Sequence, residues 1–404
     1  MAIQGTRSQS RNSLNWRDPQ KLLRDARFWG LAGQVLAILL VVFLFLVLWD
    51  NLTYNLRQLG INLGFDFLRS QASFDIGENL IPYSASDSFS QALLVGLVNS
   101  LRVMVFGLIF ATILGLVVGI ARLSDNWLLR KISLVYIEIF RNTPLLLQLF
   151  FWYFAVFLQL PDIQNRISLL NLGYLTNRGL FLPWLTTTTG AGLWTILLVI
   201  GVVGAIALWR WRTHIMIEQG RPGNQLLWAL GPLVAAVLLA FILTGNVPFS
   251  LSLPQVVEEG TQLQGGLRLS PEFGTLLTGL VVYTASFIAE IIRAGIESVP
   301  RGQWEAARAL GLKPGRIMRM VVLPQALRVI IPPLNSQYLN LVKNSSLAVA
   351  IGFPDVYFVA STTFNQTGRA PEVMLIIMVI YLTISLSISL VMNWYNQKVQ
   401  LKQR

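Results

Sequence analysis

Long apolar blocks, each of about 20 residues, recur along the chain and constrain its fold more than any other feature. A helix rises 1.5 Å per residue, so about 20 residues cross a hydrocarbon core that is about 30 Å thick. Hydrophobic residues make up 54% of the chain and charged residues only 12%. A water-facing surface could hardly be built from that balance. The sequence therefore predicts an all-α integral membrane protein.

The apolar blocks predict about eight transmembrane helices. We expect them at 29–49, 92–121, 133–160, 191–209, 226–244, 273–292, 330–352 and 373–393. The first block is too long for the core of a signal peptide, and Trp49-Asp50-Asn51 offers no small-residue cleavage site after it. We therefore expect the first block to remain as an anchor.

Charged residues between the blocks predict the orientation of the chain. Most Lys and Arg residues fall in segments on the same side of the spans as the N-terminus, and most acids fall on the other side. Positively charged loops stay in the cytoplasm. The sequence therefore predicts a multi-pass protein of the bacterial inner membrane, with both termini cytoplasmic.

Composition also excludes several functions. The net charge of +12 could suggest nucleic acid, but the basic residues sit in short segments between apolar blocks, as the positive-inside rule places them. The chain has no cysteine and a single histidine, His214, so we expect no metal site. It contains no G-x-x-x-x-G-K-[ST] phosphate loop and no nucleophile triad, so we expect neither ATP binding nor catalysis on this chain.

The spans and loops divide the chain into successive segments. We expect a cytoplasmic tail at 1–28, an extra helix with an external loop at 29–91, core helices at 92–160, an insertion with two extra helices at 161–272, further core helices at 273–395 and a cytoplasmic tail at 396–404.

The cytoplasmic loop 298–327 carries the most informative pattern. Gly302, with Pro300 before it, marks a turn, and Gln303 to Leu310 is rich in helix formers. Gly311 is placed to end that helix in a left-handed cap. Lys313-Pro314-Gly315 then forces a change of direction. A short helix held between two turns forms a rigid knob suited to a partner's groove; the alternative is a basic loop that only fixes topology.

This loop resembles the EAA motif of binding-protein-dependent importers. The match comprises Glu305-Ala306-Ala307, then Gly311, then Val321 where isoleucine is usual, and Leu323-Pro324. The resemblance implies a coupling helix that transmits closure of an ATPase dimer to the transmembrane helices. It assigns ATPase coupling to Gly302, Glu305, Ala306, Ala307, Gly311, Leu323 and Pro324.

The segment 138–152, EIFRNTPLLLQLFFW, interrupts the third span with charged and polar residues. Pro144 removes a backbone donor and should kink or restart the helix. Glu138 and Arg141 stand three apart on one helix face. They either pair with each other or line a pathway, because charges at that depth face protein or water.

The same segment resembles the E-x-x-R-x-T-P-L-L-x-Q stretch of permeases for polar amino acids, with Asn142 where glycine is frequent. Glu290 with Arg293, the segment YLNLVKNSSL at 338–347 and Asn99-Ser100-Leu101-Arg102 resemble the same group. The resemblance implies a five-helix type I permease core from the histidine, glutamine and arginine group.

Lys343 lies inside the seventh span beside polar residues. It either reaches an interface or lines the pathway, and Pro332-Pro333 suggests a discontinuous helix there. The candidate pathway or substrate residues are Glu138, Arg141, Asn142, Thr143, Gln148, Glu290, Lys343, Asn344, Ser345 and Ser346.

Two features concern helix packing and the insertion. Gly115 and Gly119 form a small-xxx-small pair that suits close approach of another helix. The basic, aromatic turn 209–214 in the insertion suits a membrane interface better than a second active centre. The enlarged form resembles the longer permease subunits of general L-amino acid importers and of the cyanobacterial neutral amino acid system.

The resemblance implies partners and an energy source outside the chain. We expect four kinds of partner: a second homologous permease, two ATP-binding-cassette ATPase subunits that hold ATP and Mg, a periplasmic amino-acid-binding protein and the lipid membrane. The expected substrate is an amino acid. We expect no cofactor on this chain and no binding to nucleic acid. The alternative is a secondary transporter of amino acids driven by ions, with Glu138, Glu290 and Lys343 as a relay. That alternative leaves the EAA motif unexplained.

Overall fold

The computed structural model describes residues 26–58, 60, 64–170, 172–220, 224–257 and 262–399. The predicted tail 1–28 lies largely outside the described residues, as do positions 400–404 of the C-terminal tail. The chain divides into two compact units, residues 1–67 and 68–404. Each unit is described by itself.

Among the described residues, the first unit contains one long helix, α2 Ala26–Gln58. Its span Phe28–Asn55 covers the predicted block 29–49 and has no buried side chains within its most apolar window. Large apolar side chains such as Leu36 and Phe43 are more than half exposed. A helix that is apolar all round and exposed is stable where lipid is the solvent.

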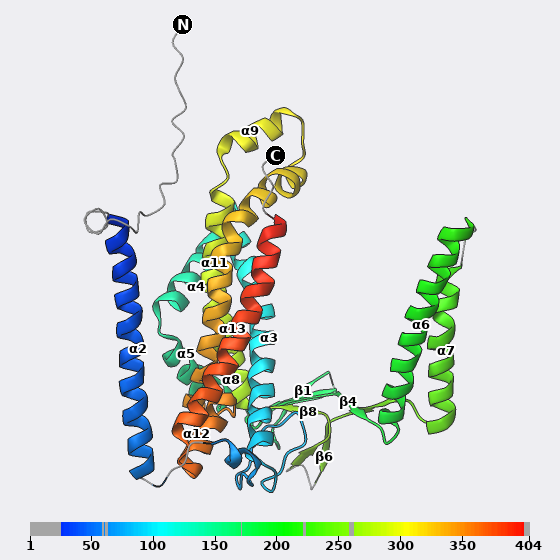
Figure 1. Cartoon of the computed structure of the whole chain (residues 1–404). Coiled ribbons are helices and arrows are strands. Elements are labelled where there is room, and N and C mark those ends of the chain that lie inside the picture. The colour runs from blue at the N-terminus through cyan, green and yellow to red at the C-terminus, as the bar shows by residue number, and fades with distance from the viewer. Residues whose placement is uncertain are drawn as a thin grey trace. The chain divides into compact units, whose positions relative to one another are not determined.

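The second unit holds the remaining helices (Figure 1). They are α3 Phe89–Arg122, α4 Trp127–Asn142, α5 Leu145–Phe150, the π-helix η2 Phe151–Phe157, α6 Ala191–Gln219, α7 Gln225–Thr244, α8 Pro271–Glu297, α9 Arg301–Ala309, α10 Pro314–Ile317, the π-helix η3 Met318–Val322, α11 Leu323–Asn344, the 3₁₀ helix η4 Ser345–Ile351, α12 Val356–Thr367 and α13 Ala370–Val399. Another 3₁₀ helix, η1 Asp66–Arg69, lies where the two units meet in the sequence.

The number of spans agrees with the sequence prediction. Among the described residues, 7 helices are long and apolar enough to cross a membrane, and the bent pair Trp127–Asn142 and Leu145–Phe157 brings the number to 8. The prediction of a mostly helical membrane protein is therefore confirmed.

Helix α8 packs against α3, α4 and α11 and forms the centre of the second unit. The glycines of α3 permit its close approach. A Cβ at Gly115 would lie 2.6 Å from Cγ2 of Ile288, and a Cβ at Gly119 would lie 2.9 Å from the carbonyl oxygen of Ala289. The predicted close approach at this small-residue pair is confirmed.

Pro144 breaks the third span as predicted. Helix α4 ends at Asn142, α5 begins at Leu145, and the two parts are bent by 107°. The buried Gln148 stabilises the break, because its Nε2 donates to the carbonyl oxygens of Phe140 and Thr143, each at 3.0 Å. Gln148 thus satisfies carbonyls that the broken helix leaves without donors.

The predicted break at Pro332-Pro333 is wrong. Helix α11 continues through both prolines to Asn344, where η4 begins. Helix α8 packs tightly on this region: a Cβ at Gly295 would lie 2.3 Å from Cγ1 of Ile330. Tight packing of this kind holds a helix together across prolines, because neighbouring groups compensate for the lost backbone bonds.

Short strands flank the α6–α7 hairpin and were not predicted. They are β1 Ile167–Leu169, β2 Gly173–Thr176, β3 Gly179–Leu182, β4 Trp184–Thr187, β5 Phe249–Ser252, β6 Gln255–Val257, β7 Gln262–Gln264 and β8 Leu267–Leu269. One sheet has the order β1-β2-β3-β8, all antiparallel, and the pairs β4-β5 and β6-β7 are separate. Strand β8 leads through Ser270, the N-cap of α8, into the bundle.

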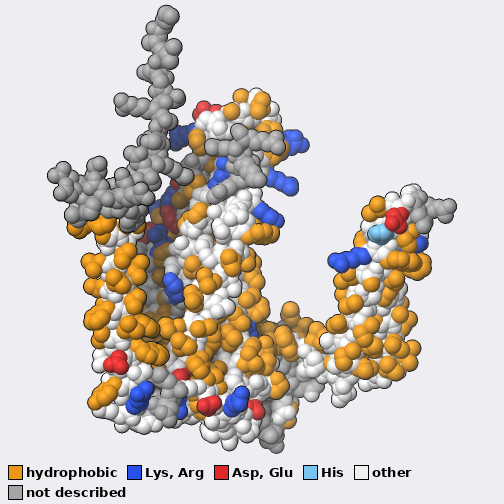
Figure 2. All heavy atoms as spheres, viewed as in Figure 1, with side chains coloured by type: hydrophobic (Ala, Val, Ile, Leu, Met, Phe, Trp, Pro, Cys, Tyr) orange, Lys and Arg blue, Asp and Glu red, His pale blue; other side chains and the backbone are white. Residues whose placement is uncertain are grey.

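The insertion forms a hairpin of α6 and α7, which confirms its two predicted spans. The indole Nε1 of Trp194 donates to Oγ1 of Thr244 and to the carbonyl oxygen of Asn246, both at 3.0 Å, and so joins the start of α6 to the end of α7. Hydrophobic side chains cover the outward surfaces of both helices (Figure 2).

Candidate functional site

The loop after α8 has the shape that the sequence predicts. Helix α9 ends in a left-handed turn at Gly311, whose φ is +70°. Gly311 N donates to the carbonyl oxygen of Arg308 at 2.9 Å, and Leu312 N donates to that of Ala307 at 3.3 Å. These two bonds form a Schellman motif, which fixes the end of a helix. Gly302 lies inside the first turn of α9, so its predicted place in a turn before the helix is wrong.

One face of α9 packs on the protein's own core. Ala307 is only 3% exposed and belongs to a cluster with Ile317, Val322 and Ala326, against which Trp304 also packs. The side chain of Ala307 therefore points inward and cannot contact a partner's groove. This core makes α9 a rigid projection.

The opposite face of α9 is available to a partner. Glu305, Ala306 and Ala309 are exposed, and Leu310 is 80% exposed at the end of the helix. Figure 2 shows hydrophobic side chains at this tip of the molecule. Leu310 and the two alanines thus give this end of the loop an exposed apolar surface.

The far end of the loop is tied back to α9. Nε2 of Gln325 donates to Oε1 of Gln303 at 3.3 Å and to the carbonyl oxygen of Val321 at 2.9 Å. Leu323 and Pro324, at the start of α11, are both exposed. The residues of the EAA pattern thus lie in one connected structure, with Ala307 inside it.

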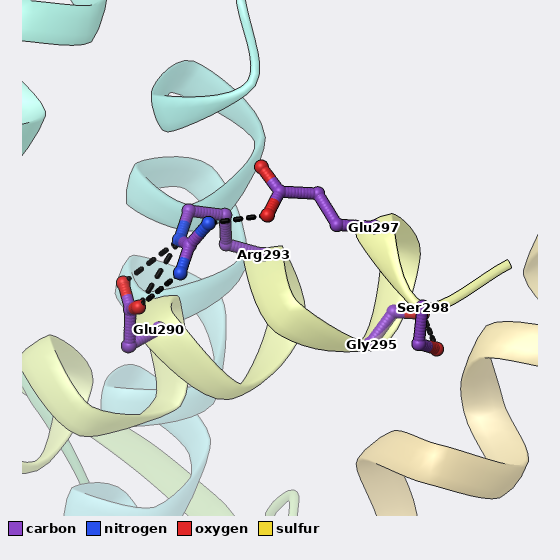
Figure 3. Close-up of polar contacts among 5 residues, drawn as sticks. All are labelled: Glu290, Arg293, Gly295, Glu297 and Ser298. Carbon is purple, nitrogen blue, oxygen red and sulfur yellow. Dashed lines mark hydrogen bonds and ion pairs between the residues drawn. The ribbon is translucent and has the colours of Figure 1, made fainter.

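A charged cluster lies at the end of α8 that leads to the loop (Figure 3). Nε of Arg293 donates to both carboxylate oxygens of Glu290, at 3.1 and 3.0 Å, and its Nη1 pairs with Glu297. The helical spacing of Glu290 and Arg293 therefore produces a two-point ion pair, which fixes both side chains.

A cavity of about 370 Å³ opens between α4, α8 and α11 beside this cluster. Its polar side chains are Arg141, Glu290 and Gln337. The other lining residues are Phe287, Ile291, Ala294, Gly295, Val329 and Pro333. The cavity therefore presents a guanidinium and a carboxylate within a mostly apolar wall, an arrangement typical of small-molecule sites.

The structure brings Arg141 to Glu290 rather than to Glu138. The guanidinium carbon of Arg141 lies 5.3 Å from the centre of the Phe287 ring, and Arg141 interacts electrostatically with Glu290. Glu138 instead accepts from Nδ2 of Asn142 at 2.9 Å. No ion pair joins Glu138 and Arg141, both of which the structure describes, so the predicted pair is wrong. Helix α8 supplies the competing carboxylate.

Sequence reasoning missed Gln337. The only available signal was a polar residue in an apolar span, one helical turn after Pro333. Gln337 reaches the cavity wall because α11 continues through Pro333, whereas the sequence predicted a break in the helix there.

The other predicted pathway residues lie outside this cavity. Thr143 donates to the carbonyl oxygen of Ile139 at 2.8 Å, and Ser346 donates to that of Lys343 at 2.7 Å. Ser345 is buried and donates to the carbonyl oxygen of Val342 at 2.8 Å. Lys343 is exposed, and Asn344 is the last residue of α11.

The spans, the projecting loop and the cavity are together typical of a membrane transport protein. Residues 219–401 match the family model described as "Binding-protein-dependent transport system inner membrane component". The chain belongs to this family, within the amino-acid ABC transporter permeases. It is thus a non-catalytic, multi-pass inner-membrane permease, and membership implies an ATPase and a binding protein as partners.

The similarity to known permeases extends over the whole chain. It is 45% identical to the putative amino-acid ABC transporter permease protein YhdX of Escherichia coli, over 98% of this chain and 99% of the relative. It is also 45% identical to the general L-amino acid transport system permease protein AapQ of Rhizobium johnstonii, over 94% of each. The glutamate/glutamine/aspartate/asparagine permease BztB of Rhodobacter capsulatus is 39% identical, over 95% of this chain and 96% of its own length. The insertion is therefore shared with these relatives.

Proposed function

We propose that the chain carries L-amino acids of several side-chain types across the inner membrane. The printed names of its full-length relatives support this substrate class. The cavity offers matching chemistry, because Arg141 can pair with an α-carboxylate and Glu290 with an α-ammonium group.

We also propose that the exposed face of α9 docks into a groove of a separate ATPase, which holds ATP and Mg. In this arrangement a second homologous permease completes the pathway, two ATPase subunits drive it, and a periplasmic amino-acid-binding protein delivers the substrate. Both termini are then cytoplasmic. The observation that carries the proposal is the rigid, core-backed α9 with Leu310 and Ala306 exposed.

The packing of the loop supports mechanical coupling. The cluster that holds Ala307 also contains Ile288 and Ile292 of α8 and Ile330 of α11. Helices α8 and α11 line the cavity as well. A displacement of α9 by the ATPase therefore moves two walls of the cavity, because packed interiors transmit strain.

The decisive test measures uptake of labelled amino acids by cells that lack this chain and express a variant. Glu305→Lys reverses a charge on the docking face, and Gly311→Asp places a side chain at φ +70°. We expect both to abolish uptake while the protein remains in the membrane. Gly315→Asp is the matched control, since Gly315 has no positive φ and open space around its Cα.

Competition by unlabelled basic, acidic and neutral amino acids defines the substrate range. Normal uptake by both loop variants would overturn the docking proposal. Uptake that persists without the ATPase and follows an ion gradient would favour the secondary-transporter alternative. Loss of the chain without effect on any amino acid would refute the substrate class alone.

A further inference from the structure

The turn end of the α6–α7 hairpin gathers an arginine and two tryptophans that the transport function does not use. The guanidinium carbon of Arg212 lies 4.8 Å from the centre of the Trp228 ring and 5.8 Å from that of Trp211. The two indole rings meet edge to face at 6.1 Å. The guanidinium is thus held in place by aromatic contacts from both helices.

Arg212 has no acidic partner among the described residues. Its Nε is buried without a hydrogen-bond partner. The nearby acid Glu218 is engaged elsewhere, with its Oε2 3.3 Å from Nδ1 of His214. A fixed cation without a counter-charge attracts an external anion, because opposite charges attract strongly where water is scarce.

An apolar cavity adjoins this arginine. It has a volume of about 360 Å³ and is lined by Leu208, Leu227, Trp228, Gly231 and Pro232. Trp228 therefore belongs both to the cation site and to the cavity wall. The cavity lies within the apolar spans Ala191–Glu218 and Gln225–Thr244, where the surrounding solvent is lipid.

We propose that this end of the hairpin binds one anionic phospholipid, with its phosphate at Arg212 and an acyl chain in the adjoining cavity. The ligand must be amphipathic, because a cation and an apolar cavity share one wall. It must be anionic, because the guanidinium of Arg212 is fixed at the site and no described acid pairs with it. Basic residues beside tryptophans at the end of a membrane helix are suited to such headgroups.

The binding test uses native mass spectrometry of the intact transporter complex, titrated with phosphatidylglycerol or with phosphatidylcholine of identical acyl chains. Arg212→Gln should weaken phosphatidylglycerol binding at least about fivefold. Arg210→Gln is the control, because it removes the same charge two residues away, at about 200° around the helix. The Arg210→Gln complex should bind phosphatidylglycerol as tightly as the native complex does. Phosphatidylcholine should bind weakly to the native complex.

A second variant tests the cavity without changing any charge. Gly231→Leu projects into the cavity, and a Cβ at Gly231 meets nothing within 4 Å, so the hairpin tolerates the change. It should also weaken phosphatidylglycerol binding. Equal losses in the Arg210 and Arg212 variants, or equal binding of both lipids, would overturn the proposal. Unchanged phosphatidylglycerol binding by the Gly231→Leu variant would show that no acyl chain occupies the cavity.

Discussion

Asp355 is a buried carboxyl group at the start of α12, with 1% of its surface exposed. Its Oδ1 accepts from Phe358 N at 2.8 Å, and the hydroxyl of Tyr381 donates to Oδ2 at 3.4 Å. Burial raises the pKa of Asp355 to about 7, although the hydrogen bonds from Phe358, Tyr357 and Tyr381 oppose the shift. The folded protein therefore binds this proton more tightly than the unfolded chain does.

This raised pKa predicts a pH dependence of stability. An unfolded Asp has a pKa of about 3.9, so the contribution of protonated Asp355 is fully present below that pH and is lost as pH rises through about 7. Asp355→Asn keeps the capping acceptor and removes the titration. The stability of the native protein relative to this variant should fall between pH 5 and pH 8, measured by thermal unfolding in detergent. A difference that does not change with pH contradicts the assignment.

Individual residues were predictable from sequence where a single physical cause decides their role. Gly311 and Pro144 are such cases, because few residue types suit a positive φ or break a helix. The direction of Ala307 and the partner of Arg141 were not predictable. Both depend on how helices pack on one another: α10 and η3 pack on α9, so that Ala307 lies in the core, and α8 brings Glu290 to Arg141.

The packing of α3 against α8 is the element-scale feature that depends most on small residues. Gly119→Leu should destabilise the protein by about 1 to 3 kcal/mol, because its Cβ would lie 2.9 Å from the backbone oxygen of Ala289, which cannot move alone. The measurement is the thermal unfolding temperature of the purified protein. Gly33→Leu in α2 is the control, since a Cβ there meets nothing within 4 Å. Equal effects of the two substitutions would show that this packing is not specific.

Element prediction succeeded for long apolar helices and failed for short strands. Hydropathy over about 20 residues gives a strong signal, so each predicted span has a counterpart in the described helices. The strands have 3 or 4 residues each, as in β1 and β2, too few for an alternating pattern to stand out. The continuity of α11 through two prolines depends on tight packing by α8, which sequence periodicity does not report.

At the scale of the whole molecule, the loop that contains α9 and the cavity between α4, α8 and α11 belong to one packed structure. Figure 1 shows α9 at the opposite end of α8 from β8. The cluster around Ala307 connects α9 to the helices that line the cavity. Sequence alone identified the loop, because its motif is continuous. It identified only part of the cavity, because the lining residues come from three separate helices.

Single-cysteine cross-linking measures whether the exposed face of α9 contacts the ATPase, as we propose. The chain contains no cysteine, so each introduced thiol is unique. Cysteines at the exposed positions Ala306 and Ala309, labelled with a photoreactive maleimide, should cross-link to the ATPase in the assembled complex. Cysteines at the inward-facing Ala307, or at exposed Ser86 before α3, should not. If intact complexes gave no cross-link from either exposed position of α9, or equal cross-linking from Ser86, then α9 would not be the docking helix.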